Sequence, residues 1–298
     1  MKAPKRHAYL ITAYNNFYTL RKLIMLLDDR RNDIFIHIDE KTRDFDFESF
    51  RNICNYSDVI FVPRIKVYWG DYSQIQSIFQ LLECAIHNKY SYYHLISGVD
   101  LPIKTQDQIH NFFAINEGKE FIGFAENFNR EWVSKIHILN RYNKSNRFIR
   151  LMINELIKKP FLKAQYLIKY DRMRFVSHEI RKGCDWFSIS YDFAIHIIKN
   201  KKIIGRLFKF SLTPTEFYAH TLIWNSSFKD SIYNIHDEYC SCLRHVDWER
   251  GLPYIFRNDD FSEIINSNKF FARKFDDRVD KDIIDNIYSW LMDKQTKS

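Results

Sequence analysis

The sequence predicts an α/β fold in which a mainly parallel sheet is flanked by helices. Apolar runs of strand length alternate with segments whose apolar residues recur at helical spacing, the pattern of a parallel sheet with crossover helices. Only 7 glycines and 6 prolines occur in 298 residues, which leaves few candidate linkers. We therefore expect residues 1–298 to form a single domain.

The first hundred residues carry this pattern most clearly. Residues 7–14, 33–41, 59–62 and 92–103 read as strands. Two helices are expected between them, with the apolar faces Leu20, Leu23, Ile24, Leu27 and Ile75, Ile78, Phe79, Leu82, Ile86. The opening strand-helix-strand unit favours a parallel sheet, whose ligand lies at the carboxyl ends of its strands.

Polar residues follow two of the predicted strands at that end. His37, Asp39 and Lys41 close the second strand, and Asp100 lies near the end of the run at 92–103. The chain has neither GxGxxG nor GxxxxGK[ST], so a phosphorylated ligand would be bound by side-chain cations. The segment FFARKF offers Arg273 and Lys274 between aromatic residues. A solvated charge pair on a loop is the alternative for these two residues.

The segment SLTPTEFYAHTLIW places Glu216 directly behind Thr-Pro-Thr and before an apolar run. Thr213 at the N-cap, Pro214 at N1 and Glu216 at N3 satisfy the capping-box pattern, which predicts a structural role. A carboxylate held at a helix start can also act as a general base. The local sequence leaves both interpretations open.

The net charge of +8 belongs to one segment. Residues 141–182 contain 12 Lys or Arg and 3 acidic residues, whereas the rest of the chain has 33 basic and 34 acidic residues. Apolar residues at helical spacing within it predict a basic amphipathic helix, with a face made of Phe148, Ile149, Met152, Ile153 and Leu156. Such a helix is typical of an anionic membrane surface, although an ordinary solvated helix has the same pattern. No nucleic-acid-binding module is recognisable, so no nucleic-acid partner is expected.

Cysteine usage and the N-terminus indicate the compartment. Five irregularly spaced cysteines favour a reducing environment over a disulfide framework. His236, Cys240, Cys242 and His245 hint weakly at zinc, with spacing unlike that of most structural sites. The N-terminus lacks the hydrophobic run of a signal peptide, and no segment has about 18 consecutive apolar residues. We expect a cytoplasmic protein.

Seven blocks, taken together, resemble one enzyme family. In chain order they are HAYLITAYNN, IHIDEK, WGDYS, YYHLISGVDLPIKT, GCDWFSIS, PTEFYAHTLIWNS and FFARKFD. Their order and spacing are similar to those of the core-2/I-branching β-1,6-N-acetylglucosaminyltransferases and the peptide O-xylosyltransferases, glycosyltransferase family 14. The resemblance covers about residues 7 to 290.

The resemblance implies a GT-A-type glycosyltransferase fold with a nucleotide-binding part at about 1–105 and an acceptor-binding part at about 106–298. It also implies inverting transfer of a sugar, GlcNAc or another UDP-linked sugar, from a UDP-sugar to a glycan hydroxyl. Family members work without the DxD-bound metal of most GT-A enzymes, so neither a metal nor another cofactor is expected. The early Asp44-Phe45-Asp46 lies before the usual position of such a motif, and we interpret it as a solvated loop.

Roles are carried over residue by residue from the matching blocks. Glu216 matches the general base, and Arg273 and Lys274 match the cations that bind the diphosphate. The other matches are Asp39 and Lys41 near the uracil, Arg250 as a further phosphate ligand with Arg244 competing, Asp100 near the reacting sugars, and Glu126, Asp185 and Trp186 on the acceptor side.

The chain departs from the family at Tyr14, Cys184, Asp71 and Tyr72, which affects the expected donor sugar more than the reaction. Without the stem, anchor and paired cysteines of Golgi members, it resembles a bacterial member that builds a surface polysaccharide on an oligosaccharide or lipid-linked acceptor. Residues 141–182 would then contact the inner membrane face. The alternatives are a metal-dependent nucleotide-sugar enzyme and a non-catalytic protein that binds membranes or carbohydrate.

Overall fold

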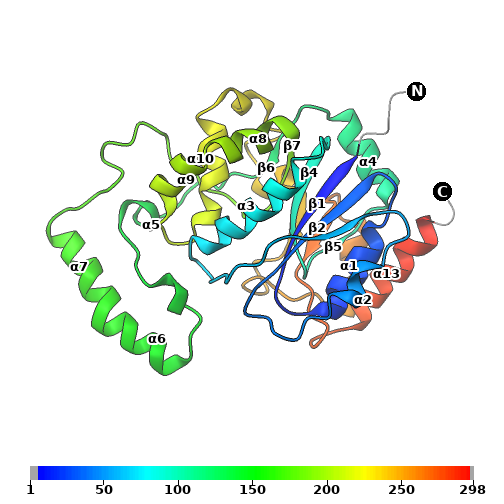
Figure 1. Cartoon of the computed structure of the whole chain (residues 1–298), viewed down its shortest axis with the longest axis horizontal. Helices are drawn as coiled ribbons and strands as arrows, with labels where there is room; N and C mark the ends of the chain where they lie inside the picture. Colours follow the sequence, from blue (N-terminus) through cyan, green and yellow to red (C-terminus); the bar gives the residue numbers. More distant parts are fainter. Residues whose placement is uncertain (1–5, 296–298) are drawn as a thin grey trace.

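A six-stranded sheet forms the centre of the computed structural model, which describes residues 6–295 (Figure 1). Its order is β3-β2-β1-β4-β7-β6. The first four strands are parallel, whereas β7 pairs antiparallel with both β4 and β6. The bounds are β1 His7–Ala13, β2 Asn32–Ile38, β3 Val59–Phe61, β4 Tyr92–Ser97, β6 Phe121–Ile122 and β7 Phe187–Ser190. The expected α/β fold with a mainly parallel sheet flanked by helices is confirmed.

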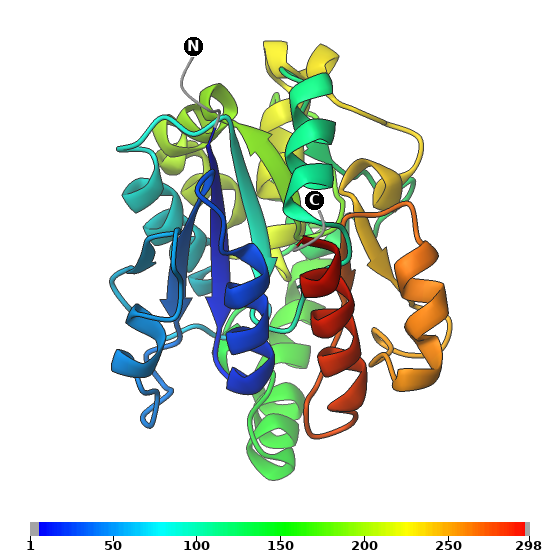
Figure 2. The ribbon, with the colours of Figure 1, turned by 90° about the vertical axis from the view of Figure 1, so that its right-hand side faces the viewer.

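Helices cover the sheet and enclose two separate hydrophobic cores. One core includes α1 and α13, which lie side by side (Figure 2), and the other includes α3, α8 and α10. The main helices are α1 Phe17–Leu27, α3 Ser73–Ala85, α4 Gln106–Ile115, α8 Tyr191–Lys199, α9 Lys201–Phe208, α10 Tyr218–Trp224, α12 Phe261–Asn266 and α13 Asp282–Gln295. Short helices are α2 Glu48–Arg51, α5 Glu131–Ser134 and α11 Glu238–Ser241, with 3₁₀ turns at Asn140–Tyr142, Pro214–Glu216, Ser227–Ser231 and Asn258–Asp260.

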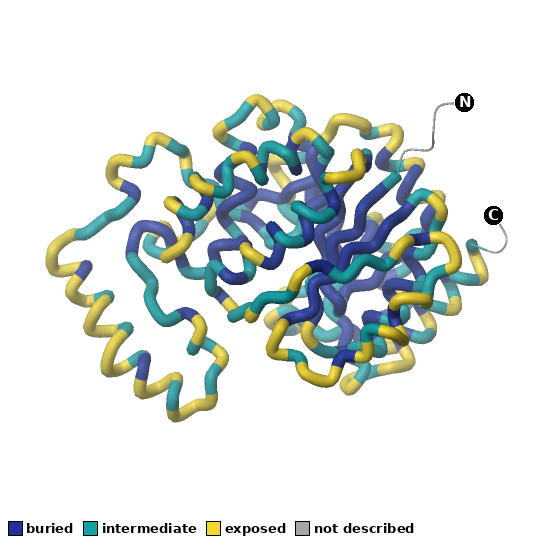
Figure 3. Tube along the Cα trace, viewed as in Figure 1, coloured by how far each residue is buried: buried dark blue, intermediate teal, exposed yellow. Residues whose placement is uncertain are grey.

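The strands and helices expected in the first hundred residues are present, but the strand expected at 92–103 is divided: β4 ends at Ser97, and the residues after the turn, Leu101–Pro102, form β5 of a second sheet. Every residue of β2 is buried, because helices cover both faces of a parallel sheet and its strands become continuous apolar runs. Leu20, Leu23, Ile24 and Leu27 form the buried stripe of α1. Figure 3 shows the central strands as the most buried part of the chain.

A second, three-stranded sheet joins the C-terminal segment to the main one. Its order is β5-β9-β8, with β5 Leu101–Pro102, β8 Arg244–Val246 and β9 Phe271–Arg273. The backbone N–H of Phe275 donates to the carbonyl of Val99 at 2.9 Å. Arg273 and Lys274, at the end of β9, are thereby placed beside the segment that leaves β4.

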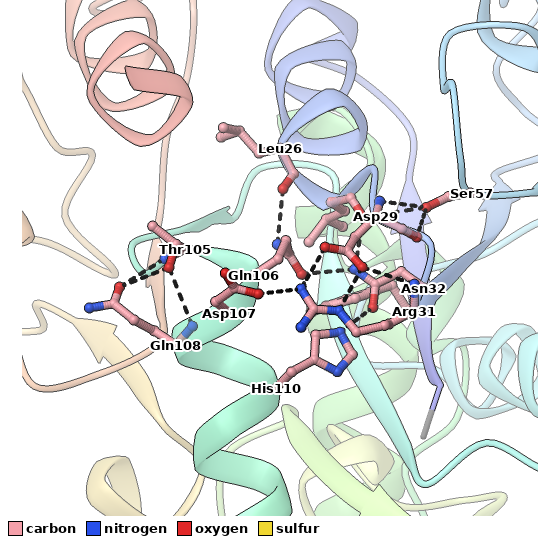
Figure 4. Close-up of polar contacts among 12 residues, drawn as sticks. Leu26, Asp29, Arg31, Asn32, Ser57, Thr105, Gln106, Asp107, Gln108 and His110 are labelled. Carbon is pink, nitrogen blue, oxygen red and sulfur yellow. Dashed lines mark hydrogen bonds and ion pairs between the residues drawn. The ribbon is translucent and has the colours of Figure 1, made fainter. Parts of the chain in front are cut away.

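A buried polar network fixes α4 at the opposite end of the sheet (Figure 4). The side-chain amide of Asn32, at the start of β2, donates to Gln106 and accepts from His110, each at 2.8 Å. Arg31 donates to Asp107 at 2.7 Å. Because each buried polar group has a partner, this network stabilises the packing of α4 against β2.

A helical arm, residues 147–167, stands apart from the body (Figure 1). It consists of α6 Arg147–Ile153, a π-helical turn Asn154–Lys158 and α7 Lys159–Leu167. The basic segment at 141–182 is therefore helical only in part. The expected apolar face is also wrong, because Ile153 is buried whereas Phe148 and Leu156 are more than 70% exposed. Within residues 6–295, no helix is long and apolar enough to cross a membrane.

The backbone at Gly183 lies so close to the backbone of Gly123 that an amino acid with a side chain does not fit there. A Cβ at this position would lie 1.9 Å from the carbonyl oxygen of Gly123 and 2.6 Å from the His220 ring. We predict that Gly183→Ala lowers the free energy of unfolding by about 2 kcal/mol or more, because backbone must move to relieve the overlap. The measurement is urea denaturation of both proteins.

Gly205→Ala is the matched control. Gly205 lies in α9, and its added Cβ would meet only the hydroxyl end of Tyr72, at 3.3 Å. Alanine favours helix by about 1 kcal/mol over glycine, so this variant should be as stable as the wild type or more stable. If both variants lose the same free energy of unfolding, the close backbone contact at Gly183 is not the cause of the destabilisation.

Candidate active site

A cleft of about 350 Å³ opens at the carboxyl ends of β1, β2 and β4. Strand order reverses between β1 and β4, and crevices at such points are where open α/β sheets bind ligands. Six of the candidate site residues expected from the sequence line this cleft: His37, Asp39, Asp185, Trp186, Arg273 and Lys274. Parallel strands and the added β9 thus bring together side chains from distant parts of the chain.

Asp39 occupies one end of the cleft and is held rigidly. It is 7% exposed and accepts hydrogen bonds from the backbone N–H groups of Lys41 and Val67, at 2.9 and 3.3 Å. The Lys41 ammonium lies 3.4 Å from its second oxygen and over the ring of Tyr68. Lys41 supports Asp39 but does not itself line the cleft.

The cationic end of the cleft is built on β9. The Arg273 guanidinium stacks on the ring of Trp186, 4.2 Å from its centroid, and its nearest carboxylate, Asp100, is 3.7 Å away. Its Nε is buried without a hydrogen-bond partner. Burial lowers the pKa of Lys274, and the neighbouring charges of Arg273 and Lys144 lower it further. Positive charge is therefore concentrated here with little direct neutralisation, as a site for an anion requires.

Glu216 lies beside the cleft, next to the lining residue Thr215. The capping-box prediction is wrong: Thr213 has a left-handed φ of 46°, its side chain caps nothing, and residues 214–216 form a 3₁₀ turn. The Glu216 carboxylate is instead 2.7 Å from the ammonium of Lys182. The Gly183 amide donates to the Glu216 carbonyl at 2.9 Å, which ties the two segments together.

The pKa of Glu216 is raised to about 7. Burial is the main cause and the negative charge of Asp185 adds to it, while Lys182 opposes both. Burial also raises the pKa of Asp185, against the influence of Thr215 and of the cations Arg273 and Lys182. One oxygen of Asp185 is buried without a partner in the described part of the chain. A carboxylate with a pKa of about 7 that lies beside a cleft is suited to accept a proton.

Four other candidates lie outside the cleft lining. Asp100 is fully buried and accepts hydrogen bonds from the backbone and hydroxyl of Ser97, so it closes the turn after β4. Arg250 forms ion pairs with the three carboxylates Asp247, Asp260 and Glu263. Arg244 is fully buried and donates to the backbone carbonyls of Cys242 and Leu95. Glu126 does not line this cleft.

Sequence reasoning missed two cations near the cleft, Lys182 and Lys144. Lys182 directly precedes the GCDWF block, and its distance in sequence from Glu216 hides their ion pair. Lys144 lies in the basic segment, where twelve cations offered no way to single it out. Only the tertiary structure identifies them.

The four-residue zinc cluster does not form. Cys242 is buried against Cys184, and His245 contacts Glu263 at 3.0 Å. Among residues 6–295, no group of three or more His, Cys, Asp or Glu side chains is arranged to hold a metal ion.

Comparison with known proteins assigns the family. Residues 7–268 match the family model of the Core-2/I-branching enzymes. The chain belongs to the Core-2/I-branching enzyme family. This match contains every residue of the site except the β9 segment and extends over most of the chain, so the predicted family is confirmed.

Curated relatives of this Core-2/I-branching family member include several xylosyltransferases. It is 23% identical to "Xylosyltransferase oxt" of Drosophila pseudoobscura pseudoobscura over 96% of its length, and 25% identical to "Xylosyltransferase sqv-6" of Caenorhabditis briggsae over 84%. The chain spans about a third of the length of these relatives, 33% and 32%. A crystal structure of mouse xyloside xylosyltransferase 1 in its apo form aligns with a TM-score of 0.40 and 11% identity, covering 90% of this chain and 96% of that one.

The Lys182 contact makes a prediction about Glu216. Replacing Lys182 with Met removes the nearby positive charge, so the pKa of Glu216 should rise above its value of about 7. NMR titration of the Glu216 carboxyl carbon measures this directly. Lys201→Met, which breaks the ion pair with Glu83, is the control and should leave Glu216 unchanged. A Glu216 pKa that stays the same in Lys182→Met would contradict the assigned contact.

Proposed function

We propose that this chain is a glycosyltransferase that moves a sugar from a UDP-sugar to a hydroxyl group of a glycan acceptor, with inversion and without a metal ion. One observation carries the proposal. A carboxylate whose pKa is raised to about 7, Glu216, lies beside a cleft that has cations at one end and Asp39 at the other. Membership of the Core-2/I-branching enzymes and relatives named xylosyltransferases support the same class of reaction.

The proposed step has a simple proton balance. Glu216 accepts the proton of the acceptor hydroxyl while the oxygen of that hydroxyl attacks the anomeric carbon. The bond from that carbon to UDP breaks on the opposite face. Burial strengthens Glu216 as a base, because it disfavours the charged carboxylate. Lys182 keeps enough of the carboxylate ionised near neutral pH for this role.

The leaving diphosphate gains negative charge as the sugar acquires oxocarbenium character. Arg273 and Lys274 would stabilise that charge, with Arg273 oriented by the ring of Trp186. Asp39 would accept hydrogen bonds from the uracil at the far end of the cleft. Asp185 and Trp186 would lie between donor and acceptor, and Glu126 would begin the acceptor loop.

The proposal specifies the donor and the acceptor by chemical class. GlcNAc and xylose are the first donor sugars to assay, because the sequence blocks resemble those of N-acetylglucosaminyltransferases and several relatives are named xylosyltransferases. The acceptor is proposed to be an oligosaccharide or lipid-linked glycan of a bacterial surface polysaccharide, handled at the cytoplasmic face of the inner membrane.

Binding of UDP tests the nucleotide site. We predict that UDP binds with equal affinity in EDTA and in Mg²⁺ or Mn²⁺, and that Arg273→Ala/Lys274→Ala weakens binding by about 100-fold or more, because two charge-assisted contacts are lost. Isothermal titration calorimetry measures both effects. Binding that requires the metal would favour a metal-dependent enzyme, and the absence of UDP binding under every condition would overturn the proposal.

Loss of the base tests the catalytic role. Glu216→Gln should lower turnover of UDP-GlcNAc or UDP-xylose by about 100-fold or more while UDP affinity is retained. Release of UDP, coupled to a colorimetric assay, measures turnover. The control is Glu83→Gln, on α3 and paired with Lys201. Full activity of the Glu216→Gln variant would contradict the catalytic role and indicate that this carboxylate is structural.

We further propose that the arm contacts an anionic membrane surface. It carries five basic residues against the single acid Glu155, which is itself paired with Lys159 at 2.6 Å. Phe148, Leu156 and Leu167 project from it with more than 70% of their surface exposed. Exposed apolar side chains among basic residues match an interface of anionic headgroups and acyl chains.

Vesicle flotation tests the membrane contact. The variant replaces three exposed arm cations, Arg150, Lys159 and Lys163, with Gln and spares Lys158, which donates to Asn143. Each cation near an anionic surface contributes about 1 kcal/mol, so binding to phosphatidylserine-containing vesicles should fall by roughly 100-fold at low salt. The control replaces three exposed lysines elsewhere, Lys89, Lys119 and Lys202, and should float like the wild type. Failure of the wild type to float would remove this part of the proposal.

A further inference from the structure

Lys144 reaches the cleft from outside the sheet. It lies three residues before the arm and lines the same cavity as Arg273 and Lys274. Its ammonium is 4.9 Å from the ring centroid of Trp69, another lining residue. The root of the arm therefore forms part of the cleft wall, although it is separated from β9 by more than a hundred residues.

The neighbouring residue Asn143 anchors this segment to the same turn. Gly70 has a φ of 70°, and a Cβ built on it would lie 3.2 Å from the side-chain nitrogen of Asn143. Asn143 also accepts a hydrogen bond from Lys158, across the π-helical turn. Asn143 thus lies against the 69–70 turn and also contacts the arm, which places the backbone of Lys144 next to that turn.

The charge of Lys144 is not neutralised by the protein. Neither Lys144 nor Lys274 forms an ion pair with a residue in the range 6–295, whereas Lys182 is paired with Glu216 and Arg250 with three carboxylates. Lys144 is close enough to Lys274 for its charge to disfavour the protonated form of that side chain. Gathering like charges costs free energy, which a bound anion of matching charge offsets.

The carboxylates that line the cleft, Asp39 and Asp185, do not offset the charge of these lysines. Asp39 is held by Lys41 and by two backbone amides at the other end. Asp185 is buried and its pKa is raised, so its negative charge is disfavoured. Asp100 lies 3.7 Å from Arg273, and the charge of Asp276 favours the protonated form of Lys274. Lys144 and Lys274 form no ion pair within residues 6–295, so they can bind a ligand that carries several negative charges.

We propose that Lys144 is a third cation that binds the diphosphate of the sugar nucleotide, so that the root of the arm completes the donor site. The inference rests on the proposed function and deepens it. It assigns to Lys144 the place that the sequence comparison gave to Arg250, whose guanidinium is occupied by Asp247, Asp260 and Glu263. The cleft then offers Arg273, Lys274 and Lys144 to the two phosphates of the leaving group.

The test compares UDP with uridine. Lys144→Ala should weaken UDP binding by about tenfold or more, because a charge-assisted contact is lost. Uridine has no phosphate, so its affinity, measured by ligand-observed NMR, should be unchanged. Lys144→Arg keeps the charge and should retain most of the UDP affinity. Lys202→Ala, an exposed cation on α9 away from the cleft, is the control and should bind UDP like the wild type.

Each outcome is decisive. UDP affinity in Lys144→Ala equal to that of the wild type would overturn the role of Lys144 while leaving the proposed function intact. Equal losses for UDP and uridine would also overturn it, since they would indicate a distorted cleft instead of a lost phosphate contact. A wild-type protein that binds no UDP would overturn the proposed function itself, and this inference with it.

Discussion

The contact between Glu216 and Lys182 is the interaction on which the site depends. Three influences meet at Glu216: burial and the nearby Asp185 disfavour its charge, and the ammonium 2.7 Å away favours it. The balance places the pKa of the carboxylate at about 7, where it is both ionised in part and able to take a proton. Without Lys182 the carboxylate would be largely protonated at neutral pH, and without burial it would be a weak base.

The fold provides this contact through close packing of distant segments. Gly183 lets the segment that leads into β7 approach the backbone of Gly123. The backbone N–H of Gly183 donates a hydrogen bond to the carbonyl of Glu216. The parallel strands then place Asp39 at the opposite end of the same cleft. Since β9 joins the segment after β4, the cations of the C-terminal region reach a cleft that is lined mainly by the first hundred residues.

Much of the fold could be predicted from the sequence, because the signals are local. Continuous apolar runs marked β1, β2 and β4, and an apolar stripe marked α1. Asp39 was found by its position after a strand, and the seven blocks pointed to Glu216, Arg273 and Trp186. The family resemblance supplied roles that spacing alone did not.

The remainder depends on tertiary contacts that leave no local signal. Thr-Pro-Thr-Glu reads as a capping box, but Thr213 adopts a left-handed φ and Glu216 turns to a lysine 34 positions earlier in the chain. Phe148 and Ile153 both lie in α6 and are five residues apart, which places them on different sides of a helix with 3.6 residues per turn. The predicted face therefore contains both Phe148, exposed, and Ile153, buried. Lys144 is one of many cations in its segment until the structure places it over Trp69.

A crystal structure of the complex with UDP, grown in the presence of EDTA, would locate the donor site. We expect the uracil to lie on the Asp39 side of the cleft and the β-phosphate to contact Arg273 or Lys274, with the Glu216 carboxylate facing the space where the sugar and acceptor would meet. UDP bound elsewhere on the molecule, or bound here in the opposite direction with its phosphates against Asp39, would contradict the account.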